Sequence, residues 1–180
     1  MVPTASGLRV IGIDPGLNIT GYGLVECCAT TATLAEAGVI RPPRSQGNNL
    51  PGRLAVLFEE IGGVLEEFNP QMMCLEEVYS HSFYPQTAIL MGHARGVICL
   101  AASLRGVPVV HLAAKRIKQS VTGNGNASKL QVQRAVRQYF SLYRVPHPPD
   151  VADALAAALC YANSLRQVRV LNRSASRGLR

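Results

Sequence analysis

The chain has 180 residues and a mass of 19.3 kDa, which is the size of one domain and long enough to bury a core. Hydrophobic residues make up 48% of it, which excludes a disordered chain, and we expect no apolar run to approach the roughly 20 residues that would span a bilayer. The formal net charge of +7 favours an anionic partner. The first residues lack the pattern of a signal peptide, so we expect a cytoplasmic protein.

The first forty residues predict three strands in close succession. Residues 8–14 form an apolar run that ends in Asp14, and Pro15-Gly16 forces a turn directly after it. Residues 21–27 and 33–40 have strand character as well. Because the connections between these strands are short, we expect them to pair as an antiparallel meander.

The rest of the chain alternates helices with short strands. Two strands and five helices are expected, in the order helix 51–68, strand 72–75, helix 85–104, strand 107–111, helix 113–121, helix 128–140 and a last helix from Asp150. This pattern predicts an α/β fold with a mixed five-stranded sheet, its first three strands antiparallel, flanked by helices. We expect a single domain over residues 1–166 and a basic, flexible tail over residues 167–180.

The acidic residues are unevenly distributed along the chain. Nine of the eleven lie before Val78, whereas residues 78–149 contain nine Lys or Arg and no acid. Five more Arg follow Asp153, again without an acid. Scattered surface charge is the ordinary explanation of basic residues, but a stretch of this length without an acid favours a polyanion such as nucleic acid. A membrane surface is the weaker alternative, because no segment is a basic amphipathic anchor.

Four carboxylates lie where active sites of such sheets are built. Asp14 ends the first strand and Glu76 follows the fourth, so both lie on one edge if these strands are parallel neighbours. Asp150 and Asp153 are three residues apart and face the same side of the last helix. Each also suits an ordinary turn or helix start. Together they predict a site for two Mg²⁺ or Mn²⁺ ions, about 4 Å apart, that activate water for phosphodiester hydrolysis.

Five segments follow one another along the chain: Ile11–Gly16 with Thr20–Gly23, Leu75–Tyr79, Gly92–Gly96, Lys115–Gly123 with Lys129, and Asp150–Ala156. In this order they resemble the bacterial RuvC-type Holliday-junction resolvases, and the resemblance runs from about residue 8 to residue 165. The resemblance implies an RNase H-like fold, a homodimer, and paired symmetric nicks in four-way DNA junctions during recombination and repair. It also implies partnership with a branch-migration motor of the RuvA and RuvB type.

The resemblance also assigns roles to single residues. The metal-binding and catalytic acids would be Asp14, Glu76, Asp150 and Asp153. Lys118 and Lys129 match the functional lysines of the family, near the scissile or flanking phosphates. Tyr79 matches an aromatic residue that stacks on a DNA base, and Lys115 and Arg116 belong to the DNA-binding basic segment. Glu77 stands where relatives have an uncharged residue, and its effect on metal preference stays open.

Other functions remain open from the sequence. A related nuclease that cuts RNA–DNA hybrids would carry similar acids, although the two lysines and the small-residue helix favour the resolvase. An actin-like or sugar-kinase-like ATPase shares the turn after Asp14 but needs two such lobes. If the protein binds junctions without catalysis, Asp14→Asn would leave every activity unchanged. Gly92 and Gly96 make their helix a candidate dimer interface, and core packing explains these small residues equally well.

Overall fold

The computed structural model describes residues 7–28, 31–43, 49–77 and 85–177, with the backbone alone for residues 85 and 169–177. Five strands and five helices follow one another along these ranges. They are β1 (Leu8–Asp14), β2 (Thr20–Cys27), β3 (Ala32–Ile40), α1 (Leu50–Phe68), β4 (Met72–Glu76), α2 (Pro85–Leu104), β5 (Val109–Leu112), α3 (Ala114–Thr122), α4 (Lys129–Tyr139) and α5 (Pro149–Arg177).

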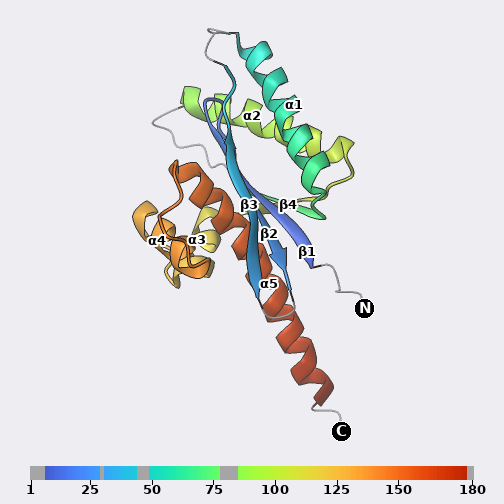
Figure 1. The fold of residues 1–180 in the computed structure, drawn as a ribbon, viewed down its shortest axis with the longest axis vertical. Coiled ribbons are helices and arrows are strands. Elements are labelled where there is room, and N and C mark those ends of the chain that lie inside the picture. The colour runs from blue at the N-terminus through green and yellow to red at the C-terminus, as the bar shows by residue number, and fades with distance from the viewer. Residues whose placement is uncertain (1–6, 29–30, 44–48, 78–84, 178–180) are drawn as a thin grey trace.

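A mixed sheet with the strand order β3-β2-β1-β4-β5 forms the centre of the molecule (Figure 1). β1 pairs antiparallel with β2, and β2 pairs antiparallel with β3. β4 lies parallel to both β1 and β5; α1 leads from β3 into β4, and α2 connects β4 with β5. The predicted meander and the predicted mixed five-stranded sheet are therefore confirmed.

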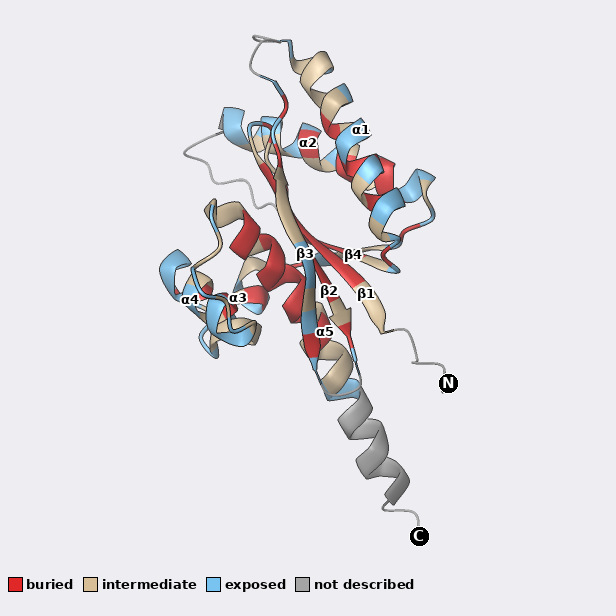
Figure 2. Cartoon of the chain, viewed as in Figure 1, coloured by how far each residue is buried: buried red, intermediate tan, exposed pale blue. Residues whose placement is uncertain are grey.

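Helices cover both faces of this sheet, and buried residues concentrate where they meet it (Figure 2). Ile11 and Ile13 of β1 pack with the buried residues of α1 and α2. Val10, on the opposite face of the same strand, packs with Leu155 and Leu159 of α5. α3 and α4 pack against α5 on that side. The two faces of the sheet thus carry two separate core clusters.

Two glycines let α5 approach the sheet at backbone distance. A Cβ atom added to Gly12 would lie 2.0 Å from the carbonyl oxygen of Ala154. One added to Gly21 would lie 2.2 Å from the carbonyl oxygen of Asp150. No side chain fits in either place, because packed atoms do not approach so closely. Gly21 pairs with Asp14 across β1 and β2, so the first turn of α5 lies against the strand end that carries Asp14.

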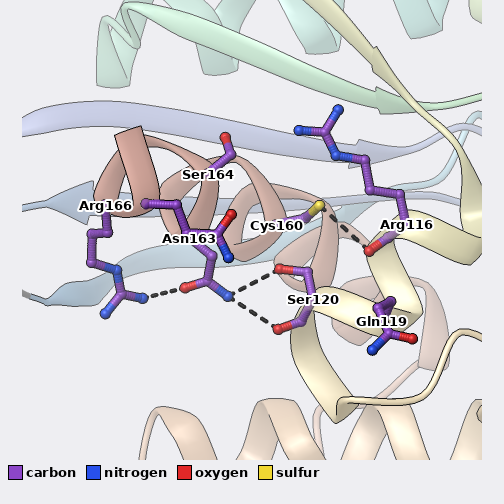
Figure 3. Close-up of a pocket in the computed structure, with 8 residues that line it drawn as sticks. Arg116, Gln119, Ser120, Cys160, Asn163, Ser164 and Arg166 are labelled. Atoms are coloured by element: carbon purple, nitrogen blue, oxygen red, sulfur yellow. Dashed lines mark hydrogen bonds between the residues drawn. The ribbon is translucent and has the colours of Figure 1, made fainter. Parts of the chain in front are cut away.

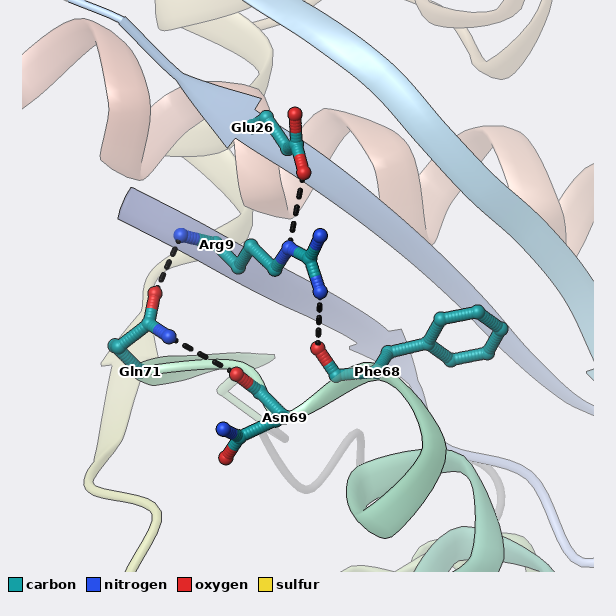
Figure 4. A network of polar contacts seen from close by, with 5 residues as sticks. All are labelled: Arg9, Glu26, Phe68, Asn69 and Gln71. Carbon is teal, nitrogen blue, oxygen red and sulfur yellow. Dashed lines mark hydrogen bonds and ion pairs between the residues drawn. The ribbon is translucent and has the colours of Figure 1, made fainter. Parts of the chain in front are cut away.

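A polar network fixes the opposite end of β1 (Figure 4). The Arg9 side chain donates from Nε to Glu26 Oε1 at 2.9 Å and from Nη1 to the carbonyl oxygen of Phe68 at 3.2 Å. Its backbone N–H donates to Gln71 Oε1 at 2.7 Å. The network joins β1, β2 and the end of α1. Since the Arg9–Glu26 pair is partly exposed, we assign it no more than about 1 kcal/mol of stability.

The structure differs from the sequence prediction by more than one residue at two element boundaries. β5 begins at Val109 instead of residue 107, because the Val107 N–H still donates to the carbonyl oxygen of Ala102, at 2.9 Å, and closes α2. α5 continues to Arg177, so residues 167–177 are helical. A domain boundary at Arg166 stays a prediction.

α2 is long and apolar enough, by length and composition, to cross a membrane over Gln86–Leu104. The expectation that no apolar stretch reaches that length does not hold for this helix. The Gly92–Gly96 segment interrupts the apolar run in the sequence but not the helix. One side of α2 is buried against the protein through Ala94, Ile98 and neighbouring residues, and its other side is exposed.

Candidate active site

Two of the predicted acids lie next to each other at one edge of the sheet. β1 and β4 are parallel neighbours, and Asp14 and Glu76 are their last residues. Both side chains are half-buried. Thr20, which is fully buried, closes the turn after Asp14: its hydroxyl donates to the carbonyl oxygen of Gly16 at 2.7 Å and accepts from the Gly16 N–H at 3.2 Å.

The other two acids reach this edge from the first turns of α5. Asp150 and Asp153 are both half-buried, and the close contact at Gly21 places their helix end against β2. A helix N-terminus favours negative charge by about 0.3–1 kcal/mol per carboxylate. The structure therefore brings the four predicted acids to one end of the sheet.

Lys129 supplies positive charge to these acids. Its Nζ lies 2.8 Å from Asp153 Oδ2. A capping box fixes the start of α4, in which the Gln131 N–H donates to Ser128 Oγ and the Ser128 N–H donates to Gln131 Oε1. A cation in the first turn of a helix is normally unfavourable, and the ion pair with Asp153 offsets that cost.

The charges of the acids are only partly compensated. Burial raises the pKa of Asp14 from its ordinary 3.8 to about 7, with three neighbouring carboxylates as the next causes. These neighbours are, in decreasing order of effect, Asp153, Asp150 and Glu76. Burial likewise raises the pKa of Glu76, and the charge of Asp153 adds to the rise. Burial alone would lower the pKa of Lys129, but its hydrogen bond and charge contact with Asp153 raise it instead.

Two cavities meet at Lys129. The smaller one, of about 160 Å³, is lined by Glu76, Lys118, Lys129 and Asp153, with apolar residues of α3 and α4 beneath them. The larger one, of about 500 Å³, lies between the turn after Asp14, the start of α5 and the side of α2. Asp14 and Asp150 line this second cavity. The acids thus line two adjoining hollows that a ligand can enter.

The chemistry of these residues fits a hard divalent cation, although the four acids do not form the predicted set of metal ligands in this structure. Carboxylate oxygens are the ligands that Mg²⁺ and Mn²⁺ prefer. Burial and then the neighbouring carboxylates raise the pKa of Asp14, and a bound cation would favour its charged form. Within the described ranges, however, no three acidic, His or Cys side chains converge as a ligand set. The Lys129 ammonium group is paired with Asp153 instead.

Sequence reasoning missed two arginines beside the acids. Arg53 of α1 donates from Nη2 to the carbonyl oxygen of Leu17 at 2.8 Å and to Asn18 Oδ1 at 2.6 Å. It thereby holds the turn after Asp14 and lines the larger cavity. Arg95 of α2 donates to the carbonyl oxygen of Glu76 and contacts the ring of His111. The resemblance includes Arg95 in a family segment, but no local pattern marks Arg53.

The remaining predicted DNA contacts are not in this site. Tyr79 lies outside the described residues. Lys115 is exposed and its side chain lies beside Gly125, away from the acids. Arg116 is also exposed and lines a different hollow, between α3 and α5. Glu77 lines neither of the two acidic cavities, and its effect on the metal stays open.

Fold and site together define a nuclease of the RNase H-like α/β class, with carboxylates at the ends of two parallel strands and at the start of a helix on the sheet. The family model described as crossover junction endodeoxyribonuclease RuvC matches residues 10–161. The protein of that name from Rhodopirellula baltica is 49% identical over 151 residues, which cover 84% of each chain. The one from Methylobacillus flagellatus is 37% identical over 158 residues, covering 86% of this chain and 87% of that protein.

Solved structures agree with this assignment. Thermus thermophilus RuvC in complex with a Holliday junction substrate matches with a TM-score of 0.80 and 32% identity, over 89% of this chain and 96% of that one. The yeast mitochondrial Holliday junction resolvase Ydc2, at 17% identity and a TM-score of 0.66, shares the fold. The chain belongs to the RuvC family of crossover junction endodeoxyribonucleases.

Proposed function

We propose that this protein is a metal-dependent endonuclease that resolves four-way DNA junctions by paired symmetric nicks, in recombination and repair. The observation that carries the proposal is the gathering of four acids and two lysines at one end of the sheet. Family membership supports the substrate, since a relative of the same fold was solved with a Holliday junction. The alternative of a two-lobed ATPase lacks such support, because the family model that matches residues 10–161 is that of a nuclease and leaves too little of the chain for a second lobe.

In this mechanism Asp14, Glu76, Asp150 and Asp153 hold the divalent metal ions, two per site. When bound, the ions supply Lewis acidity for the attack of water on the phosphodiester and for the leaving 3′ oxygen. The raised pKa of Lys129 keeps its ammonium group protonated beside the acids, where it can bind a phosphate oxygen. Lys118 lines the same cavity and adds a second cation for the backbone.

The choice between Mg²⁺ and Mn²⁺ and the other partners rest on the family alone. We propose that either ion supports cutting, because both are hard cations that accept carboxylate ligands. We also propose a cytoplasmic location and cooperation with a branch-migration motor of the RuvA and RuvB type. The geometry of the site does not bear on the choice of ion, on the location or on the motor.

A homodimer is proposed through the exposed side of α2. Ile89, Leu100 and Leu104 are 60%, 52% and 67% exposed there. A Cβ atom added to Gly92 or Gly96 would meet nothing within 4 Å, so core packing does not explain these glycines. A two-fold axis through this face would give two identical sites, as paired symmetric cuts require.

Changing Leu100 to Lys is expected to convert the protein to a monomer and to abolish coordinated paired nicks. The charge would be buried without a partner in the dimer, whereas the exposed position tolerates it in the isolated chain. Sedimentation measures the mass, and a circular junction plasmid separates single from paired nicks. Tyr143→Lys, at an apolar position that is 92% exposed outside α2, is the control. A dimeric Leu100→Lys protein would contradict this interface.

The proposed substrate is tested by comparing cutting of a four-way DNA junction, a linear DNA duplex and an RNA–DNA hybrid of the same sequences. We expect the junction to be cut at least about tenfold faster than either linear substrate, because specific binding of one structure exceeds nonspecific backbone binding. Preferential cutting of the hybrid would instead support the RNase H alternative.

A further inference from the structure

The largest hollow among those described lies away from the acids, between α3 and α5 (Figure 3). Its volume is about 920 Å³. Polar side chains from both helices line it, among them Arg116, Gln119, Ser120, Asn163, Ser164 and Arg166. None of the described residues that line it is acidic, so the hollow combines two full positive charges with neutral hydrogen-bonding groups.

Hydrogen bonds fix the floor and one end of this hollow in place. The Asn163 amide nitrogen donates to the carbonyl oxygen of Ser120 at 3.2 Å and to its Oγ at 3.1 Å. The Arg166 guanidinium donates to Asn163 Oδ1 and, at 2.9 Å, to the hydroxyl of Tyr139. Arg166 is therefore held in position by side chains of α4 and α5 instead of extending into solvent.

Arg116 is placed differently. Its carbonyl oxygen accepts a contact from Cys160 Sγ at 3.8 Å, which ties the backbone of α3 to α5. Its side chain is exposed, and the guanidinium group lies beside the Cys160 thiol: burial raises the pKa of Cys160, while the charge of Arg116 and a side-chain hydrogen bond from it act in the opposite direction. Figure 3 shows the two guanidinium groups at opposite ends of the hollow, with Asn163 and Cys160 between them.

This hollow and the acidic site lie along the same side of α5. Cys160, Ser164 and Gln167 follow Asp153 by 7, 11 and 14 residues, which is the spacing of one helix face. Asn163 lies about 15 Å further along the helix axis than Asp153, at 1.5 Å per residue. α3 borders both places, with Lys118 lining the acidic cavity and Arg116 lining the hollow. A nucleic-acid strand bound at the acids therefore has the hollow within a few nucleotides of its path.

We propose that this hollow binds the phosphodiester backbone of a junction arm, a few nucleotides from the phosphate that is cut. Two separated guanidinium groups suit successive phosphates of one strand better than a single small anion. The neutral amide and hydroxyl groups between them provide further backbone contacts. The inference rests on the proposed function and adds to it a second contact that positions the arm without taking part in the chemistry.

Arg116→Gln tests the proposal, because the side chain is exposed and its one recorded internal contact is with the Cys160 thiol. Arg9→Gln is the matched control: it removes the same charge from the opposite face of the sheet, where Arg9 contacts Phe68 of α1. Binding of a four-way junction is measured in chelator over a range of salt concentrations, by fluorescence anisotropy. Ethylation of single phosphates then identifies which of them each protein contacts.

For Arg116→Gln we expect junction affinity to fall about three- to tenfold and the slope of log K against log salt to become shallower by about 0.9 per lost phosphate contact. Ethylation at one or two phosphates of an arm should weaken binding by the wild type but not by the variant. Arg9→Gln should keep the wild-type slope and ethylation pattern. An Arg116→Gln protein that keeps both would overturn the proposal, provided that the wild type cuts junctions. A wild type that neither binds nor cuts them would instead refute the proposed function.

Discussion

Replacing Asp153 with Asn is expected to reduce junction cutting at least about a thousandfold, which corresponds to roughly 4 kcal/mol of transition-state stabilisation. Asp153 lines the smaller cavity together with Glu76 and both lysines, and it pairs with Lys129 at 2.8 Å. An amide removes the charge that holds a divalent ion, and it also releases Lys129. Junction binding should stay within about threefold of wild type, because the basic residues that contact the backbone are unchanged.

Single-turnover cutting and gel-shift binding measured on the same junction separate these two effects. Glu59→Gln is the control, since it makes the same chemical change on an exposed position of α1. It should retain both activities. Equal loss of cutting and binding in Asp153→Asn would contradict a catalytic role and would indicate that the residue supports the fold or the DNA surface.

Asp14→Asn is expected to stabilise the metal-free protein at pH 8. The folded protein holds the pKa of Asp14 at about 7, above the ordinary 3.8, so folding takes up a proton between these two pH values. Stability therefore falls as the pH rises from about 4 through 7, and the cost of the buried charge is fully present above that window. An uncharged Asn avoids this cost. We expect a gain of about 1–2 kcal/mol, or roughly 2–8 °C in Tm.

Thermal unfolding in chelator at pH 8 and at pH 4 measures this effect. The gain from Asp14→Asn should become much smaller at the lower pH, where the folded wild-type carboxyl is protonated and the unfolded one is close to its ordinary pKa of 3.8. Adding Mg²⁺ or Mn²⁺ at pH 8 should raise the Tm of the wild type and raise that of the variant much less, because a ligand that binds only the folded state stabilises it. A variant less stable than wild type at pH 8 would show that the carboxylate is not under electrostatic strain.

Much of the positioning of the acids could be predicted from the sequence. The apolar run that ends at Asp14 and the short strand that ends at Glu76 are local patterns. Their parallel pairing is a condition of the sequence prediction, and the structure shows it. The spacing of Asp150 and Asp153 is likewise local. The backbone contact of α5 with Gly12 and Gly21 brings the acids of the strand ends together with the acids of the helix. No local pattern in the sequence reveals this contact.

The features that the sequence did not reveal depend on contacts between distant segments. Arg53 holds a turn that lies 35 residues earlier in the chain. Lys118 and Arg116 are neighbours in the basic segment, yet α3 directs them into separate hollows. The exposed apolar side of α2 is composed of the same residue types as its buried side, so only the packing of α1 distinguishes them.

The measurement that tests the central claim most directly is cutting of a labelled mobile four-way junction by the purified protein, with Mg²⁺, with Mn²⁺ and with chelator. The account predicts pairs of symmetric nicks in opposed strands that depend on the metal ion and are absent in chelator. Tight binding of the junction without nicks under either metal would contradict it, since the acids and lysines would then form a binding surface and not a catalytic site.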